Sequence, residues 1–362
     1  MRKILASVIM VMVLCAGAHA DLIYTTSSGG MGVVRINGES ADLRGIQYTG
    51  SSDTLMASYW DGEASRVILV NRTTDTTTSG DTALVFNPSD LSTPLNTEPV
   101  VLEGVYNTQV LVGTYTGNSI YAASGALVRE FRTDGFSRVR GYTCKADSGD
   151  TQAPTVKAIT SAKYIVNVLA EYETSGDVLL RFDGQLREDI EDFTKWQAPS
   201  ETTAITYTSN SWLAVAHETG VSYLTSTGFS EIVSTDAPVK ALCPDKNEGF
   251  YFIEQSADGT TYLRHRSEGE TLDLLTVSSG TECRLAADTD NGVFGAVIGG
   301  KLYVYAMRED TLMGEYDSSA LGGSPRDIAF GNVSGESKSS NSGCSAFGMG
   351  MLLLCAVFLR RR

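Results

Sequence analysis

The body of the chain alternates short apolar runs with polar turns, and no long stretch carries apolar residues at helical spacing. The runs are rich in Val, Ile, Tyr and Thr. They are separated by a polar residue and a glycine at Asp61-Gly62, Ser124-Gly125, Asp134-Gly135, Asp183-Gly184, Asp258-Gly259 and Asn291-Gly292. Period-two runs joined by such turns are typical of β-hairpins. The pattern therefore predicts an all-β protein, with at most a turn or two of polar helix between Gln185 and Trp196.

The strands recur in a longer register. Positions 43 residues apart match at Leu242 and Leu285, at Asp245 and Asp288, and at Gly249 and Gly292. Apolar strands that fit the first position of the unit begin near Leu22, Leu55, Ile120, Tyr164, Trp212, Phe250 and Val293, at a mean interval of about 45 residues. A four-stranded unit of about 40 to 50 residues is the repeat of a β-propeller blade. We therefore expect a β-propeller of about seven blades over residues 21–332.

The two ends of this body predict a closed ring. Ile328-Ala329-Phe330 matches the strand that precedes each unit, and Leu22-Ile23-Tyr24 matches the first strand of a unit. The N-terminal strand would then complete the last blade and leave no free sheet edge. Tandem β-sandwiches are the alternative, but they do not explain the shared register. A Thr/Ser-rich insertion from Thr73 to Asp81 falls in the longest interval and predicts a long loop or a decorated blade.

The first twenty residues have the pattern of an export signal. Arg2 and Lys3 precede an apolar run from Ile4 to about Gly17, and Ala18-His19-Ala20 follows as a small-x-small cleavage site. We predict a signal peptide over residues 1–20, cut after Ala20 by a signal peptidase. A retained N-terminal helix is the alternative. The bulky Leu14 before Cys15 disfavours a lipoprotein signal.

The C-terminus combines a polar tether with an apolar tail. Residues 333–343 are mainly Gly, Ser, Glu, Lys and Asn, a composition that favours a flexible segment. Residues 344–362 hold 15 apolar positions from Ser345 to Leu359 and then Arg360, Arg361 and Arg362. A helix of this length spans about 22 Å, short of the bilayer core of about 30 Å unless the arginines snorkel. The tail predicts a transmembrane helix that ends on the cytoplasmic side.

The tail also carries a resemblance. Ser342-Gly343-Cys344-Ser345-Ala346-Phe347-Gly348, with the Leu-rich span and Arg cluster that follow it, resembles the C-terminal sorting tails of the GlyGly-CTERM type, in the variant found in Synergistetes. The resemblance implies that a rhomboid-like intramembrane protease cuts near Gly343 and Cys344, and that the new end is modified for display at the cell surface. It covers about 20 residues and concerns location alone. A plain tail anchor that is never cut is the alternative.

Charge and cysteine content narrow the partners. The formal charge of -15 includes Arg2, Lys3 and the three terminal arginines, so a body without these five cations carries -20. Such a surface repels nucleic acid and anionic lipid and argues against both as partners. Three body cysteines, Cys144, Cys243 and Cys283, exclude a disulfide-built scaffold. Cys243 and Cys283 fall near equivalent positions of neighbouring units and could form one bridge; three reduced thiols are the alternative.

Few residues of the body suggest chemistry. Its two histidines, His217 and His265, are expected to be exposed strand residues, and no motif of a hydrolase, metalloprotease or phosphate-binding loop is present. The acidic turns that start at Asp245, Ser256 and Asp288 are interpreted as β-turns. Neighbouring acids at Glu188-Asp189 and Glu191-Asp192 are interpreted as a solvated surface. We therefore assign no catalytic residue, cofactor or metal.

The sequence favours a surface or secreted module that binds a protein, peptide or glycan on one face of the ring. The alternative is an extracellular polysaccharide lyase or glycosidase, since enzymes also use propellers and the fold alone does not choose. Three or more carboxylates with an arginine at the centre of the ring would favour the enzyme. A bare polar channel would favour the binding module.

Overall fold

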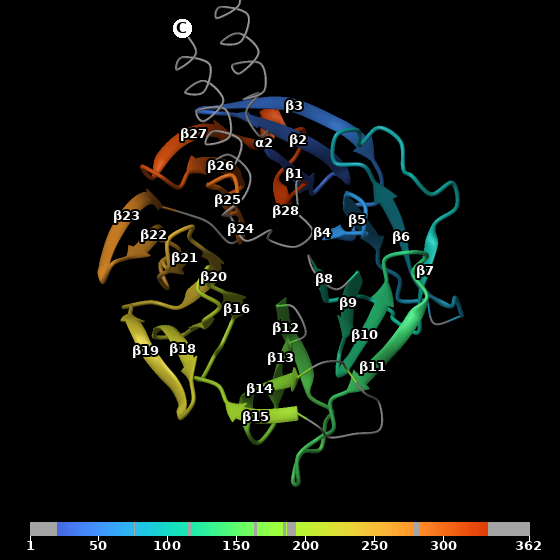
Figure 1. The fold of residues 1–362 in the computed structure, drawn as a ribbon, viewed down its shortest axis with the longest axis vertical. Helices are drawn as coiled ribbons and strands as arrows, with labels where there is room; N and C mark the ends of the chain where they lie inside the picture. The colour runs from blue at the N-terminus through green and yellow to red at the C-terminus, as the bar shows by residue number, and fades with distance from the viewer. Residues whose placement is uncertain are drawn as a thin grey trace, which may run out of the picture.

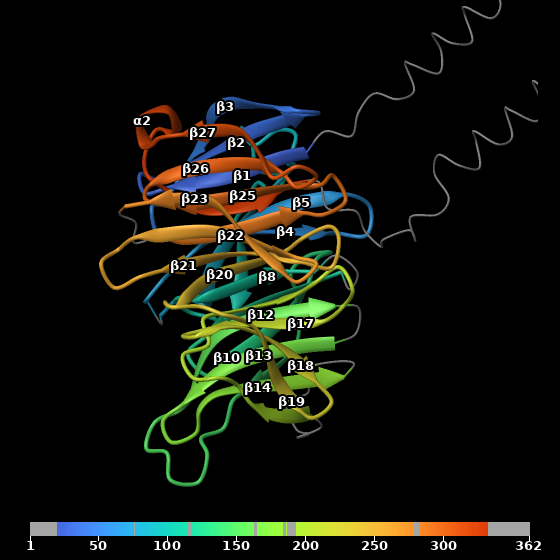
Figure 2. The same cartoon turned by 90° about the vertical axis from the view of Figure 1, so that its left-hand side faces the viewer.

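The computed structural model of the chain describes residues 20–75, 77–114, 118–162, 165–183, 186, 193–278 and 282–331. Within these ranges the strands form seven four-stranded antiparallel sheets arranged in a ring (Figure 1). The side view shows the strands running from one face of the ring to the other (Figure 2). The predicted seven-bladed β-propeller is confirmed.

In each blade the first-named strand lies at the centre of the ring and the last-named strand at its rim. Blade 1 is β28 (Pro325–Phe330), β1 (Ala20–Thr26), β2 (Gly30–Asn37) and β3 (Ser40–Thr49), and blade 2 is β4 (Thr54–Trp60), β5 (Ser65–Asn71), β6 (Gly80–Phe86) and β7 (Val100–Glu103). Blade 3 is β8 (Val110–Gly113), β9 (Ser119–Ser124), β10 (Leu127–Arg132) and β11 (Arg138–Thr143), and blade 4 is β12 (Thr155–Ala162), β13 (Ile165–Tyr172), β14 (Gly176–Asp183) and β15 (Phe193–Gln197).

The remaining blades follow the same order. Blade 5 is β16 (Ala204–Tyr207), β17 (Leu213–His217), β18 (Gly220–Thr225) and β19 (Gly228–Ser234), and blade 6 is β20 (Val239–Pro244), β21 (Phe250–Gln255), β22 (Thr261–Ser267) and β23 (Glu270–Val277). Blade 7 is β24 (Cys283–Asp288), β25 (Val293–Ile298), β26 (Lys301–Ala306) and β27 (Thr311–Tyr316). A single helical turn, α2 (Ser318–Leu321), precedes β28 and is capped by the Asp317 carboxylate.

Blade 1 closes the ring with strands from both ends of the body. β28 pairs with β1 in antiparallel register, with Leu22 opposite Phe330 and Tyr24 opposite Ile328. The predicted closure is confirmed, although the N-terminal segment supplies three strands of the blade and not one. One unit start was wrong, because Leu55 lies in innermost strand β4, whereas Leu22, Ile120, Phe250 and Val293 lie in second strands. The described residues of the Thr/Ser-rich insertion form a loop after β5, except for Gly80 and Asp81, which begin β6.

The core lies between neighbouring blades. In one cluster, Ile23 and Val33 of blade 1 pack with Leu69 and Phe86 of blade 2, and each is at most 2 % exposed. Aromatic side chains fill several of these interfaces, as in the edge-to-face pair of Tyr48 and Phe86, whose ring centroids lie 4.9 Å apart. Such ring pairs add to the apolar contact between neighbouring sheets.

Two buried aspartates link consecutive blades. Asp81 at the start of β6 accepts hydrogen bonds from the backbone N–H of Thr73, Asn107 and Thr108, at 2.7, 3.0 and 2.7 Å. Asp177 at the start of β14 accepts one from Thr202 N–H at 2.6 Å in the same way, just before the next innermost strand. Both carboxylates fix the point at which the chain passes to the next blade.

We expect Asp81→Ala to lower the free energy of unfolding by about 3 kcal/mol, because three backbone donors lose a charged acceptor in a site without exposure. Urea denaturation followed by fluorescence measures the loss. The matched control is Asp134→Ala, a change at an exposed turn residue that should leave the urea midpoint in place. Equal midpoints for Asp81→Ala and the native protein would contradict this role.

The predicted disulfide is not formed. Cys144, Cys243 and Cys283 are buried free thiols, and burial raises the pKa of each. Cys243 lies near the end of β20, whereas Cys283 begins β24, the parallel innermost strand of the next blade. Cys243 and Cys283 differ by three positions along these parallel strands, which corresponds to about 10 Å. This exceeds the Cα–Cα distance of about 7 Å that a disulfide bridge spans.

The predicted end signals fall largely outside the described residues. Ala18, Gly343, Cys344 and the arginines at 360–362 are among the residues without description. Ala20 is the first described residue; it opens β1 and is 1 % exposed. No helix in the described ranges is long and apolar enough to cross a membrane, and the predicted transmembrane tail lies outside those ranges.

Candidate functional site

A groove opens where blades 5 and 6 meet at one face of the ring. Its volume is about 810 Å³. Three turns supply most of its lining: the β16–β17, β20–β21 and β22–β23 turns. The lining residues are Ser209, Asn210, Tyr223, Ile232, Lys246, Asn247, Glu248, Gly249, Arg266, Ser267, Glu268 and Gly269. We refer to this site as the blade 5–6 groove.

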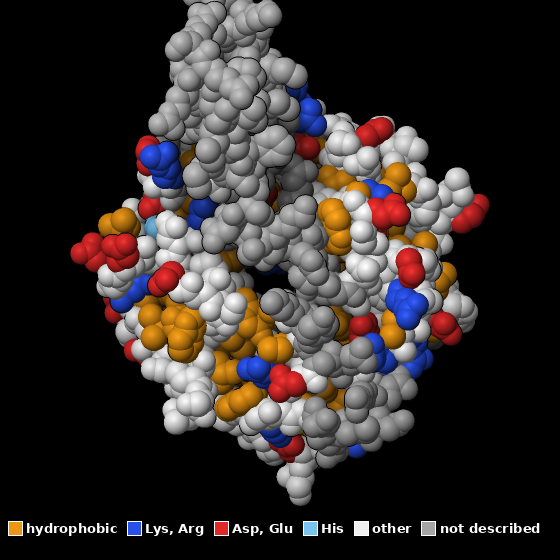
Figure 3. Space-filling view, viewed as in Figure 1, with side chains coloured by type: hydrophobic (Ala, Val, Ile, Leu, Met, Phe, Trp, Pro, Cys, Tyr) orange, Lys and Arg blue, Asp and Glu red, His pale blue; other side chains and the backbone are white. Residues whose placement is uncertain are grey.

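The groove lies on the same face as the two ends of the body. The β16–β17 and β20–β21 turns follow innermost strands, and Gly331 follows innermost strand β28 at the equivalent position. Ala20 begins the next strand beside it, and Gly331 N–H donates to the Asp21 carbonyl at 2.7 Å. Figure 3 shows this face, with hydrophobic side chains gathered over β16 to β19.

An exposed aromatic platform flanks the groove. Trp212, at the end of the β16–β17 turn, is 49 % exposed and stacks on Tyr223 of β18, with ring centroids 6.0 Å apart and planes inclined by 23°. Burial raises the pKa of Tyr223, and the charges of Arg266 and Glu248 act on the same hydroxyl in opposite directions. Tyr223 therefore connects the aromatic platform with the charged side chains that line the groove.

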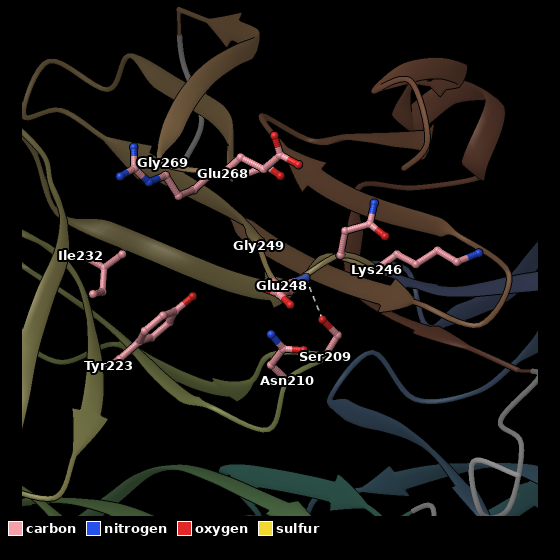
Figure 4. A pocket seen from close by; sticks show the side chains of 12 residues that line it. Ser209, Asn210, Tyr223, Ile232, Lys246, Glu248, Gly249, Glu268 and Gly269 are labelled. Atoms are coloured by element: carbon pink, nitrogen blue, oxygen red, sulfur yellow. Dashed lines mark hydrogen bonds between the residues drawn. The ribbon is translucent and has the colours of Figure 1, made fainter. Parts of the chain in front are cut away.

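The turns around the groove are held in unfavourable backbone conformations. Ser211, Glu248 and Glu268 have φ angles of 63°, 89° and 50°, in the left-handed region that favours glycine. Each such residue costs about 1–3 kcal/mol and persists only where its surroundings fix it. The hydrogen bond from Glu248 N–H to Ser209 Oγ, 2.9 Å long, joins the turns of the two blades and fixes one of these residues (Figure 4).

The charged residues of the groove are balanced. Lys246 and Arg266 supply two cations, and Glu248 and Glu268 supply two carboxylates, although the body as a whole is strongly acidic. In the close view Tyr223 and Ile232 form one side of the groove, and Lys246 points away from them (Figure 4). The lining can therefore donate and accept hydrogen bonds without presenting a net charge.

A buried ionic cluster lies directly behind two of these turns. His265 of β22 places Nδ1 at 2.8 Å from Oδ2 of Asp310. Its Nε2 lies 3.3 Å from Oδ2 of Asp245, in an ion pair without hydrogen-bond geometry. Tyr251 donates its hydroxyl to Oδ1 of Asp310 at 3.0 Å and stacks on the imidazole, with centroids 4.2 Å apart. We call these four side chains the His265 cluster.

The His265 cluster keeps the imidazole charged at neutral pH. Burial lowers the pKa of His265, but Asp245 and Asp310 raise it by more, to about 9. Burial likewise raises the pKa of Asp245, and His265 together with backbone N–H groups more than reverses this, so that the pKa is lowered. Asp245 begins the turn that ends at Gly249, and His265 precedes Arg266. The cluster therefore fixes two sides of the groove.

Both histidines are buried, so the prediction of exposed side chains was wrong. His217 is 4 % and His265 is 7 % exposed. His217 Nε2 lies 2.9 Å from Ser222 Oγ, and burial lowers its pKa. The acidic turns are confirmed as turns, since Asp288 accepts from Asn291 N–H and Asp258 from Thr260 N–H. The Glu188-Asp189 and Glu191-Asp192 pairs lie outside the described residues.

The centre of the ring carries few acids. Across the seven innermost strands, all of them described, the acidic residues are Asp288 and Asp327. Asp288 binds the Asn291 side chain of its own turn. Asp327 of β28 accepts from Met56 N–H in β4 at 3.1 Å, and burial raises its pKa while Arg284 of β24 opposes that rise. The seven innermost strands therefore do not supply the three carboxylates that would favour an enzyme.

The described part of the chain holds no group of three or more His, Cys, Asp or Glu that could bind a metal ion. The blade 5–6 groove could hold a polar organic ligand, since it combines an apolar platform with side-chain amides and charges of both signs. Sequence reasoning missed this groove because three separate turns build it. One signal was available: Trp212 follows a turn and has polar neighbours on its N-terminal side.

Comparisons with known proteins support the fold. Neither a protein-family model nor a curated protein matches the chain. A periplasmic gluconolactonase of Pseudomonas aeruginosa superposes with a TM-score of 0.61 at 15% identity, covering 87% of this chain and 100% of that one. A Bacteroides fragilis protein assigned as a 6-phosphogluconolactonase gives 0.62 at 12% identity, covering 87% and 99%. At these identities the likeness establishes that this chain shares the propeller fold of those proteins.

Proposed function

We propose that the protein is an exported β-propeller that binds a component of the cell envelope through the blade 5–6 groove. The observation that carries the proposal is a groove of about 810 Å³ lined by Tyr223, with the half-exposed Trp212 stacked on that ring and three strained turns around it. An exposed aromatic platform and backbone strain both lower the free energy of unfolding. Proteins retain such features at sites where they serve ligand binding. These features support a role as a binding module.

The position of the groove suits an envelope ligand. The described body ends at Gly331 on the groove face, so a tether that follows it would leave the ring from the same face as the groove and keep the groove near the envelope. The predicted export signal and the predicted sorting tail support a location at the cell envelope or surface. Signal peptidase and a rhomboid-like protease would be its processing partners.

The intact mass of the protein recovered from the cell surface tests this location. We expect a chain that begins at Asp21 and ends near Gly343, with a modification on the new end and three reduced thiols. A mass that matches an unmodified chain ending at Arg362 would contradict cleavage of the tail. A chain that begins at Met1 and stays in the cytoplasm would contradict export altogether.

Binding itself is tested by cosedimentation with the insoluble envelope fraction of the cells that produce the protein. The native protein should pellet in a saturable manner. A variant in which Ser209→Ala removes the contact between the two turns should pellet less, because Glu248 loses the hydroxyl that fixes its backbone. Absence of saturable pelleting by the native protein would sink the proposal.

An enzyme that cleaves a polysaccharide or a lactone is the second candidate. The solved structures with this fold include a gluconolactonase, and Asp327 has the raised pKa that a general acid needs. Both Asp327 oxygens, however, accept backbone N–H groups, from Met56 and from Ile328, and hold β28 against β4. The carboxyl is therefore better placed to join blades 1 and 2 than to transfer protons.

We expect glucono-δ-lactone to hydrolyse at its spontaneous rate in the presence of the purified protein. A pH-stat assay at neutral pH measures this directly. Saturable hydrolysis that is lost in a folded Asp327→Asn variant, but kept in an Asp288→Asn variant, would favour the enzyme over the binding module.

A further inference from the structure

We infer that the ligand of the blade 5–6 groove is a neutral carbohydrate, one sugar ring of which stacks on Trp212. The inference rests on the proposed function and names its ligand class. Two observations carry it: the geometry of the aromatic platform and the balance of polar groups beside it.

The platform is flat, exposed and rigid. Trp212 and Tyr223 lie nearly parallel, and the indole is 49 % exposed. The turn under the indole is tied twice, because Thr208 N–H donates to the Trp212 carbonyl at 2.9 Å and Trp212 N–H donates to Thr208 Oγ1 at 3.2 Å. A pyranose ring presents a flat face of C–H groups that matches such a surface, and a platform that is already ordered loses little entropy on binding.

The polar lining suits hydroxyl groups. A sugar hydroxyl both donates and accepts, so it is best met by side chains of both kinds within one groove. Asn210 and Asn247 supply amides, Arg266 supplies donors, and Glu248 and Glu268 supply acceptors. A polyanion would meet two carboxylates here and a body of strongly negative charge. The balance therefore favours a ligand without net charge.

The construction of the groove disfavours an extended peptide. Peptides commonly add a strand to a free sheet edge, where backbone groups supply the affinity. Turns line most of this groove, and the N–H of Glu248 is already used by Ser209. A peptide would therefore find side chains here in place of a ladder of free backbone donors and acceptors.

The experiment uses the envelope pelleting assay with two pretreatments. One portion of the envelope fraction is oxidised with periodate, which cleaves vicinal diols of sugars, and is quenched before the protein is added. A second portion is digested with proteinase K and washed. We expect periodate to reduce bound protein at least tenfold and proteinase K to leave it within twofold of the untreated level. The protein is used in its processed form, with the whole propeller present.

The outcomes separate the two proposals. Binding that survives periodate would overturn the carbohydrate inference, and loss after proteinase K alone would replace the glycan with a protein partner while leaving the binding function in place. No binding to untreated envelope would overturn the binding function itself. Binding that is lost after periodate supports the inference, whatever carrier holds the glycan.

A second readout reports the stacking. In a Trp60→Phe/Trp196→Phe variant, Trp212 is the remaining tryptophan, so its emission follows the platform alone. Titration with neutral oligosaccharides released from the envelope should shift and saturate this emission. An emission that is unchanged at concentrations where those oligosaccharides compete for envelope binding would overturn the placement of a sugar on Trp212.

Discussion

Replacing His265 with glutamine is expected to lower the free energy of unfolding by about 3 kcal/mol at pH 6. A rise of the pKa from 6.5 to about 9 represents that much interaction of the imidazolium with Asp245 and Asp310. Glutamine keeps much of the volume but leaves the buried carboxylate of Asp245 and the half-buried carboxylate of Asp310 without a cation. Urea denaturation of the native protein and of His265→Gln measures the difference.

The direction of the His265 pKa shift determines how the stability difference changes with pH. The pKa of His265 is higher in the folded state, so its contribution is fully present below about pH 6.5 and is lost as the pH rises through about 9. The stability difference between the native protein and His265→Gln should therefore shrink between these values. Asp245 and Asp310 face the imidazole, and Tyr251 stacks on it.

His217→Gln is the matched control with the opposite sign. Burial lowers the pKa of His217, so this histidine stabilises the fold in its neutral form and its contribution falls as the pH drops below about 6.5. The two variants should thus diverge from the native protein at opposite ends of the pH range. Parallel curves for both variants would contradict the account of the His265 cluster.

Trp212→Ala is expected to weaken envelope binding about 30-fold, which corresponds to about 2 kcal/mol for a central aromatic contact. The change removes the platform but should leave the fold intact, because the indole is half exposed. Saturation curves from the pelleting assay give the apparent dissociation constant. Trp212→Tyr should retain most of the affinity, since a smaller ring still offers a flat apolar face.

Leu312→Ala serves as the control for general surface hydrophobicity. Leu312 lies on outermost strand β27 of blade 7 and is 44 % exposed, close to the exposure of Trp212. Its removal should leave envelope binding unchanged. Equal effects of the two substitutions would show that binding depends on exposed apolar area in general and would contradict a specific role of Trp212.

The fold followed from the sequence because a propeller repeats its pattern. The spacing of Leu242 and Leu285, and of Gly249 and Gly292, predicted blades whose strands pair as expected. The register was least clear near Leu55, where an apolar innermost strand resembles a second strand. The closure by β28 and β1 was predictable because each end supplied only part of a unit.

The site was less predictable, since it depends on which turns meet across a blade boundary. Nothing local in the sequence indicates that Ser209 reaches the backbone of Glu248, or that Asp310 faces His265. The burial of His265 did have a signal. Thr261, Leu263 and His265 share one face of β22, and all three are buried. The flanking Arg264 and Arg266 lie on the other face, and their charge favoured the prediction of an exposed strand.

Hydroxyl-radical footprinting of the protein on its envelope ligand shows whether the blade 5–6 groove is the binding site. Aromatic side chains react readily, so the modification of Trp212 and Tyr223 reports whether the blade 5–6 groove is covered. We predict that both become protected on pelleted envelope material, while Tyr262 on β22 and Leu312 on β27 react as in the free protein. Unchanged modification of Trp212, with protection elsewhere on the ring, would contradict the assignment of the groove as the ligand site.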